Sequence, residues 1–293
     1  MRALILTTTA LVAFAANSLL CRMALGPDQI DASSFTTVRL AAGALILAPL
    51  AWRSRAAVDR PSWTLAFALF AYAIAFSFAY TTLSTGTGAL LLFGAVQTTM
   101  IGAGLLAGER PRAGEWIGLM LALVGLVWLV LPGLTAPPLH GSALMVGAGL
   151  AWGVYSLRGR NAASPGAATA WSFLRAAPFT LVVTIGMLLI RPEAVHVSPK
   201  GLLLAAVSGA VTSGLGYVAW YAALRAHTAT SAAIVQLAVP VLAGLAGVLV
   251  LNEIVSIRLA FATALVLGGV ALAVSARKPR KTPEQRILGT LVK

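Results

Sequence analysis

The sequence predicts an all-α polytopic membrane protein. Of its 293 residues, 59% are hydrophobic and only 10% are charged, whereas ordinary soluble domains carry about 25% charged residues. So few charges cannot cover the surface of a soluble chain of this length. The composition therefore argues against a soluble enzyme, a disordered chain and a disulfide-bonded scaffold. Cys21 is the single cysteine, which excludes an internal disulfide and a zinc cluster of several thiolates, and we expect neither a metal site nor a cofactor.

The first half of the chain contains five apolar stretches long enough to cross a bilayer, which takes about 20 mostly apolar residues. Turn-forming sequences such as Gly26-Pro27-Asp28 and Asp59-Arg60-Pro61 separate them. The break near residues 84–87 is very short and fits a tight helical hairpin. We expect these spans at residues 3–20, 34–52, 63–83, 87–107 and 114–131.

The second half begins after Pro137-Pro138 and contains five further apolar stretches. Ser164-Pro165-Gly166 and Arg191-Pro192 separate three of them, and the break near residues 225–227 is again short. Because two breaks are weak, nine or eleven spans are the alternatives to ten. We expect these spans at residues 141–157, 168–190, 201–224, 228–251 and 257–275.

The first span has a second interpretation. Arg2, the apolar run after it and Ala13-Phe14-Ala15 also resemble a cleaved secretory signal. An internal repeat pairs this stretch with a later helix, which favours its retention as a membrane span.

The formal net charge of +13 first raises the possibility of nucleic-acid binding. The basic residues instead lie in short clusters between apolar stretches, so we expect no nucleic-acid partner. With ten spans and an inner N-terminus, 15 Lys and Arg lie on the inner side and 4 on the outer side, which the positive-inside rule assigns to cytoplasmic termini. The inner set is Arg2, Arg53, Arg55, Arg60, Arg110, Arg112, Arg158, Arg160, Arg225, Arg277, Lys278, Arg280, Lys281, Arg286 and Lys293, and the outer set is Arg22, Arg191, Lys200 and Arg258.

The two halves of the chain resemble each other. A shift of 144 residues places Glu109 on Glu253 and Gly125 on Gly269, and a shift of 136 places Arg39 on Arg175. Chance matches between small and apolar residues are the alternative. Five spans per half would make the repeats inverted, a common construction of secondary transporters that bind substrate where the halves meet. We expect one repeat at residues 1–133, a second at 140–276, and a disordered basic cytoplasmic tail at 277–293.

One segment also resembles a known family. Trp220-Tyr221-Ala222-Ala223-Leu224, Thr228 to Ile234, Pro240 and Leu251-Asn252-Glu253 are similar to the repeat signature of the drug/metabolite transporter superfamily, in its ten-helix EamA form. The resemblance implies two inverted five-helix repeats and export of amino acids, drugs or other metabolites. In size and layout the chain resembles most the bacterial amino-acid exporters, including those for aromatic amino acids, which implies a multi-pass protein of the bacterial inner membrane.

Polar side chains inside the spans are candidates for substrate contact, because an unpaired polar group in hydrocarbon is costly. Amides and hydroxyls can hold amino and carboxylate groups without a full charge in the bilayer. Bonding between helices is the alternative, above all for Ser and Thr. The candidates are Asn17, Ser77, Tyr80, Gln97, Thr212, Ser213, Tyr217 and Gln236.

Aromatic residues form a second group of candidates. Trp152 lies near the centre of the sixth span, and with Phe78, Tyr155, Tyr217 and Tyr221 it is expected to line a cavity for aromatic or large apolar groups. Ordinary packing or lipid contact is the alternative.

Two arginines lie about two turns inside their spans. Arg39 and Arg175 occupy matching positions in the repeats and are candidates for a gate or for a substrate carboxylate; extension of the side chain to the interface is the alternative. Glu109 and Glu253 end the fourth and ninth spans, where they are expected to set helix ends or pair with basic residues. Pro178 and Pro240 interrupt helical hydrogen bonding and are candidate flex points.

These features favour an alternating-access exporter of small molecules, with amino acids foremost. No Asp, Glu or His lies at mid-membrane and no phosphate-binding Gly-x-x-x-x-Gly-Lys motif is present, so facilitated diffusion is the simplest energetics. We expect no catalytic residue, and small-molecule and lipid partners without an obligate protein partner, so that a monomer suffices. The alternatives are a multidrug or other metabolite exporter, a channel or structural bundle, and an intramembrane enzyme, for which Ser213-Gly214 is the single hint of a nucleophile.

Overall fold

The computed structural model describes residues 1–53, 62–108, 112–130, 136–160, 162 and 164–276. These residues form ten helical segments of membrane-spanning length, which confirms the predicted number. Seven segments are long and apolar enough to cross a membrane by length and composition alone. Glu109 and the tail 277–293 lie outside the described residues.

The segments follow the expected order. In the first half they are α1 (Arg2–Leu25), α2 (Ala32–Arg53), α3 (Trp63–Tyr80), α4 (Thr85–Leu106) and α5 (Ala113–Val130). In the second half they are α6 (Leu139–Arg160), α7 (Pro165–Ile190), the short helix η2 (Pro192–Ala194), α8 (Pro199–Val207), η3 (Ser208–Leu215), α9 (Gly216–Leu224), α10 (Ala229–Val235), α11 (Ala238–Leu251) and α12 (Ile257–Ser275).

Hydroxyl side chains begin the helices at both short linkers. The Ser84 hydroxyl accepts a hydrogen bond from the Thr87 N–H at 3.4 Å, and the Thr228 hydroxyl accepts one from the Ser231 N–H at 3.1 Å. Such a cap satisfies one of the free N–H groups of a helix start. A linker of a few residues is therefore enough to reverse the chain, which explains the tight hairpins before α4 and α10.

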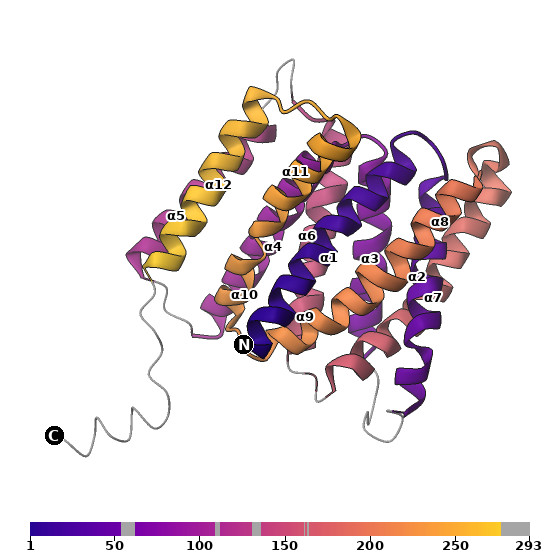
Figure 1. Ribbon diagram of the computed structural model, residues 1–293, viewed down its shortest axis with the longest axis horizontal. Helices are drawn as coiled ribbons and strands as arrows, with labels where there is room; N and C mark the ends of the chain where they lie inside the picture. Colours follow the sequence, from indigo (N-terminus) through magenta and orange to yellow (C-terminus); the bar gives the residue numbers. More distant parts are fainter. Residues whose placement is uncertain (54–61, 109–111, 131–135, 161, 163, 277–293) are drawn as a thin grey trace.

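The ten crossings place the N-terminus and the end of α12 at the same face of the bundle (Figure 1); we call this face the terminal face and the other the opposite face. The second half begins at the opposite face, so the two halves enter the membrane from opposite sides. Figure 1 also shows α5 and α12 side by side at one end of the bundle. Their close approach depends on Gly269, where a Cβ would lie 2.3 Å from the Gly118 carbonyl oxygen.

Two spans of the second half are not continuous α-helices. The eighth span contains the π-helix η3 between α8 and α9, and the ninth is interrupted between Val235 and Ala238. Pro240 lies in the first turn of α11, directly after this interruption, whereas Pro178 lies inside α7. Interruptions of this kind occur often at functional sites.

The π-helix crosses α2 at very short range. A Cβ at Gly209 would lie 2.0 Å from the Arg39 carbonyl oxygen, and one at Gly43 would lie 3.1 Å from the Gly209 carbonyl oxygen. Only glycine permits this approach of two backbones. The crossing brings the side chains of η3 into contact with those of α2.

At the opposite face, Asp31 joins the linker before α2 to the linker before α8. Its carboxylate accepts hydrogen bonds from the Ser33 and Ser34 N–H groups, each at 3.0 Å, and from the His196 N–H at 3.2 Å. Burial raises the pKa of Asp31, but the hydrogen bonds to its charged form outweigh burial, so the pKa lies below its ordinary value. Ile30 and Val197 add an isolated antiparallel bridge between the same linkers.

Candidate functional site

A buried arginine lies at the centre of the molecule. Arg39, about two turns into α2, has no exposed surface. Its Nε donates to the Ser213 hydroxyl at 2.9 Å, and its Nη2 donates to the hydroxyls of Tyr72 at 3.1 Å and Tyr217 at 2.7 Å. The guanidinium also lies 5.1 Å from the centre of the Phe76 ring, within the range of a cation–π contact. One charge thus links α2, α3, η3 and α9.

No carboxylate of the residues that the structure describes neutralises the charge of Arg39. Among the described residues, the ion pairs within 4 Å are Arg22–Glu253 and His196–Asp28. The Nη1 of Arg39 is buried and has no hydrogen-bond partner within the described part of the chain. Since a buried, unpaired charge is costly, this guanidinium is suited to receive an anion through its free Nη1.

Asn17 of α1 forms the neighbouring polar centre. Its Oδ1 accepts hydrogen bonds from three hydroxyls, those of Ser208 at 2.7 Å and of Thr212 and Ser213 at 3.3 Å each. Its Nδ2 donates to the Tyr72 hydroxyl at 3.5 Å. Ser213 therefore contacts both Asn17 and Arg39, and the two polar groups form one connected network in the bundle interior.

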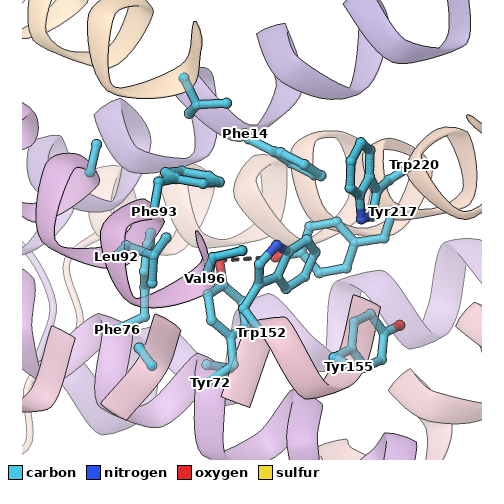
Figure 2. Close-up of a cluster of buried hydrophobic side chains, with 14 of the residues drawn as sticks. Phe14, Tyr72, Phe76, Leu92, Phe93, Val96, Trp152, Tyr155, Tyr217 and Trp220 are labelled. Carbon is cyan, nitrogen blue, oxygen red and sulfur yellow. Dashed lines mark hydrogen bonds between the residues drawn. The ribbon is translucent and has the colours of Figure 1, made fainter. Parts of the chain in front are cut away.

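Aromatic rings surround this network. Figure 2 shows Phe14, Tyr72, Trp152 and Tyr217 converging from four helices. The Trp152 ring centre lies 5.2 Å from that of Phe14, 5.0 Å from that of Tyr72 and 4.6 Å from that of Tyr217. The Tyr217 hydroxyl donates to the Tyr72 hydroxyl at 3.1 Å (dashed in Figure 2). The polar network thus has an aromatic wall on one side.

Several residues predicted from the sequence meet here. Asn17, Arg39, Thr212, Ser213 and Tyr217 belong to the polar network. Trp152 lies in the aromatic wall, and its Nε1 donates to Gln236 Oε1 at 2.9 Å. Tyr155 and Tyr221 continue the wall, with ring centres 4.9 Å apart.

Other predicted residues lie elsewhere. Ser77 bonds to the Ala73 carbonyl of its own helix, and Tyr80 to the Thr85 carbonyl. Gln97 donates to the Ala233 carbonyl at 2.9 Å and so joins α4 to α10. The remaining two are partly buried: Phe78, packed at the edge of the core, and Arg175, which lies 4.4 Å over the ring centre of Trp63.

Sequence reasoning missed Tyr72, Ser208 and Phe14. Tyr72 carries a hydroxyl at the middle of the third span, the same signal that singled out Ser77 in that helix. Ser208 precedes Thr212 by one helical turn, which places both on one side of the eighth span. Phe14 gave no signal, because an aromatic residue in an apolar helix is ordinary.

A separate polar cluster lies at the opposite face. The carboxylate of Glu253, just after α11, accepts hydrogen bonds at 3.0 Å from the N–H and the hydroxyl of Thr85 at the start of α4. It also lies 3.5 Å from the Arg22 Nε, and Arg22 donates to the Tyr80 carbonyl at 3.1 Å. Glu253 thus sets a helix end and pairs with a basic residue, as predicted. We call Arg22, Thr85 and Glu253 the latch, since it joins α1 and α4 to the second half.

A hollow of about 580 Å³ opens at the terminal face. It lies among the ends of α1, α7 and α9 and carries two positive charges. Its lining includes Arg2, Leu6, Pro165, Val218, Ala222 and Arg225.

Comparison with known proteins agrees with this architecture. Residues 1–131 and 139–275 match the model of the EamA-like transporter family. The chain belongs to the EamA-like transporter family. It is therefore a multi-pass membrane transporter, and the resemblance seen in the sequence is confirmed.

Several relatives cover most of this EamA-like chain. The uncharacterized protein PA1977 of Pseudomonas aeruginosa is 51% identical over 97% of this chain and 98% of its own. The threonine/homoserine exporter RhtA of Escherichia coli K12 is 29% identical over 87% of this chain and 86% of its own. A solved crystal structure superposes with a TM-score of 0.65 at 22% identity, over 91% of this chain and 98% of its own, and supports the fold alone.

Proposed function

We propose that the chain is an alternating-access secondary transporter that exports small carboxylate-bearing metabolites, amino acids foremost, across the bacterial inner membrane. The observation that carries the proposal is the buried guanidinium of Arg39, with its free Nη1 and no carboxylate partner among the described residues. A substrate carboxylate would neutralise this charge and fill the open hydrogen-bonding position. In this role Arg39 selects the anionic end of the cargo.

The relatives support amino acids as cargo. RhtA of Escherichia coli and RhtA of Salmonella typhimurium, which is 30% identical over 76% of this chain, both carry the name of threonine/homoserine exporters. Substrate would enter from the cytoplasm through the hollow of the terminal face, where Arg2 and Arg225 attract anions. This direction agrees with the cytoplasmic termini that the excess of Lys and Arg in the inner segments of the sequence predicts.

Aromatic amino acids are a second candidate class, and the ring wall favours them. Phe14, Trp152 and Tyr217 lie directly beside the arginine site, with Phe14 in edge contact with both other rings. The aromatic ring of a substrate could replace some of the contacts among these three side chains with little loss of packing. Trp152 and Gln236 would then govern the preference for large side chains. Other metabolites or drugs that lack an amino group are the alternative cargo.

Facilitated diffusion is the energetics that we propose. The carboxylates of the described residues lie in linkers or at helix ends rather than in mid-span, namely Asp28, Asp31, Glu115, Glu193 and Glu253. A proton relay through the membrane centre therefore has no buried carboxylate to use in these segments. We expect net transport in liposomes, measured at constant substrate, to persist when an ionophore removes the proton gradient, and its collapse with that gradient would contradict this view.

Counterflow in proteoliposomes tests the function. Proteoliposomes that contain the purified protein are loaded with unlabelled amino acid. The exchange of this amino acid for external labelled threonine, homoserine, phenylalanine or tryptophan is then measured. We expect exchange of at least one of these, and a loss of about tenfold or more in kcat/KM for Arg39→Gln, because a charge-assisted hydrogen bond is lost. Arg191→Gln, an exposed arginine at the end of α7, serves as the matched control and is expected to transport normally. Full exchange by Arg39→Gln would contradict the role of Arg39.

A further inference from the structure

The Oδ1 of Asn17 receives more hydrogen-bond donors than it can bind well. A carbonyl oxygen has two lone pairs, yet the hydroxyls of Ser208, Thr212 and Ser213 all lie within 3.3 Å of it. The contact with Ser208 is short, whereas the other two are long. The Thr212 hydroxyl also donates to the Ser208 carbonyl at 2.9 Å, so it has another partner. One acceptor position on Asn17 is therefore held weakly and can be taken over by a stronger donor.

The Asn17 side-chain oxygen and the Arg39 guanidinium lie close enough for one α-amino acid to reach both. Both groups reach the same Ser213 hydroxyl, Arg39 Nε at 2.9 Å and Asn17 Oδ1 at 3.3 Å, so they lie within about 6 Å of each other. An α-amino acid carries its carboxylate and its ammonium group on adjacent atoms of one short unit. Its carboxylate can bind the Arg39 guanidinium while its ammonium group replaces the Ser213 contact at Asn17.

The amide oxygen of Asn17 can accept an ammonium group, and in the absence of substrate it leaves the charge of Arg39 unpaired. An aspartate here would form an ion pair with Arg39 and remove the free position for an anion, whereas an amide oxygen leaves that position open. A compound with an amine and no carboxylate would meet the positive charge of Arg39 and be repelled.

Resting on the proposed function, we propose that Asn17, with the hydroxyls of Ser208 and Thr212, is the subsite for the ammonium group of the substrate. The transported class is then α-amino acids with a free amine and a free carboxylate. Asn17 is the residue that excludes the corresponding hydroxy acids, which offer a carboxylate but no ammonium group.

Analogue competition tests this assignment on the wild-type chain. The amino acid that exchanges best in counterflow is challenged with its 2-hydroxy acid, its N-acetyl derivative and the amine that lacks the carboxylate. We expect the hydroxy acid and the N-acetyl derivative to compete about 10- to 100-fold more weakly than the amino acid, because each lacks the charged donor. Equal competition by the hydroxy acid would overturn the ammonium subsite and leave the carboxylate role of Arg39 standing. Equal competition by the carboxylate-free amine would overturn the proposed function itself.

Asn17→Leu tests the residue, since leucine fills a similar volume without an acceptor. We expect this variant to lose affinity for the amino acid and to discriminate little between it and the hydroxy acid. The matched control is Thr37→Val, which removes a 2.9 Å hydroxyl contact to Thr184 between α2 and α7 and is expected to keep the discrimination. Unchanged discrimination in Asn17→Leu would overturn the assignment. If Asn17→Leu fails to fold, the wild-type analogue series decides alone.

Discussion

The latch of Arg22, Thr85 and Glu253 is expected to hold the opposite face closed. Opening this face separates the two halves, and Glu253 joins them through Thr85 and Arg22. Replacing Glu253 with Gln keeps the size of the side chain and one acceptor oxygen but removes its charge. We expect this change to destabilise the closed state of the opposite face.

The magnitude follows from the contacts that change. The Arg22–Glu253 distance is 3.5 Å and their side chains are 26% and 16% exposed, so the ion pair contributes at most about 1 kcal/mol. The bonds from Thr85 lose their charged acceptor, which weakens them by about 1 kcal/mol. The sum is about 1–2 kcal/mol, which raises the population of the open state about 5- to 30-fold.

The rate at which the Cys21 thiol is labelled measures opening of the opposite face. It is the single cysteine of the chain, it is fully buried, and it lies next to Arg22 on α1. A membrane-impermeant thiol reagent added at the opposite face therefore labels the wild type slowly. Glu253→Gln should label about 5- to 30-fold faster, and Arg22→Gln by a similar factor.

The control is Glu193→Gln, which changes an exposed carboxylate of η2 without touching the latch. Its labelling rate should equal that of the wild type. If Glu253→Gln labels at the wild-type rate while Cys21→Ser confirms that the signal comes from this thiol, the latch does not hold the face closed.

Three further predictions concern stability. Gly209→Ala should lower the melting temperature in detergent strongly, because a Cβ there would lie 2.0 Å from the backbone of α2 and overpacking costs about 1–3 kcal/mol or more; Gly147→Ala, with open space around its Cβ position, should melt like the wild type. Trp152→Phe keeps a ring but leaves the side-chain oxygen of Gln236 without its 2.9 Å donor, so thermal unfolding should show a loss of about 1–3 kcal/mol, and an unchanged melting temperature would argue against this bond. Because the folded-state pKa of Asp31 lies below its ordinary value of 3.8, its contribution to stability should be complete above that pH and vanish as the pH falls through the lowered pKa; Asp31→Asn should flatten this part of the pH–stability curve, and a curve of wild-type shape would refute the argument.

The fold was largely predictable because a bilayer imposes a length on every apolar segment. Ten runs of about 20 residues, separated by proline, glycine and charge, leave few alternatives for the topology. Even the weak breaks near residues 84–87 and 225–227 were predictable as helix starts, since Ser84 and Thr228 are ordinary helix caps. The π-helix η3 could not be predicted from the sequence. Its sequence, Ser208–Leu215, is small and apolar like its surroundings, and its geometry depends on contact with α2.

The site was predictable by residue type and less so by position. Arg39 and Arg175 have equivalent sequence signals, but packing buries the first completely and leaves the second partly exposed, stacked on Trp63. Gln97 and Gln236 were both expected to line a cavity. Gln97 donates to a backbone carbonyl and lines a pocket among α4, α5, α10 and α12, whereas Gln236 accepts a hydrogen bond from Trp152. Which face of a helix meets which neighbour is decided by packing between distant segments. A single sequence contains no direct record of those contacts.

The lone charge of Arg39 also has a consequence for the response to membrane voltage. A cation inside the bilayer lies within the transmembrane field, and transfer of one charge across 100 mV corresponds to about 2.3 kcal/mol. An amino acid in its zwitterionic form adds no net charge when it binds, so the empty and the loaded carrier feel the same field. Voltage would then shift the balance between the two facing states while leaving the final concentration ratio of the cargo unchanged.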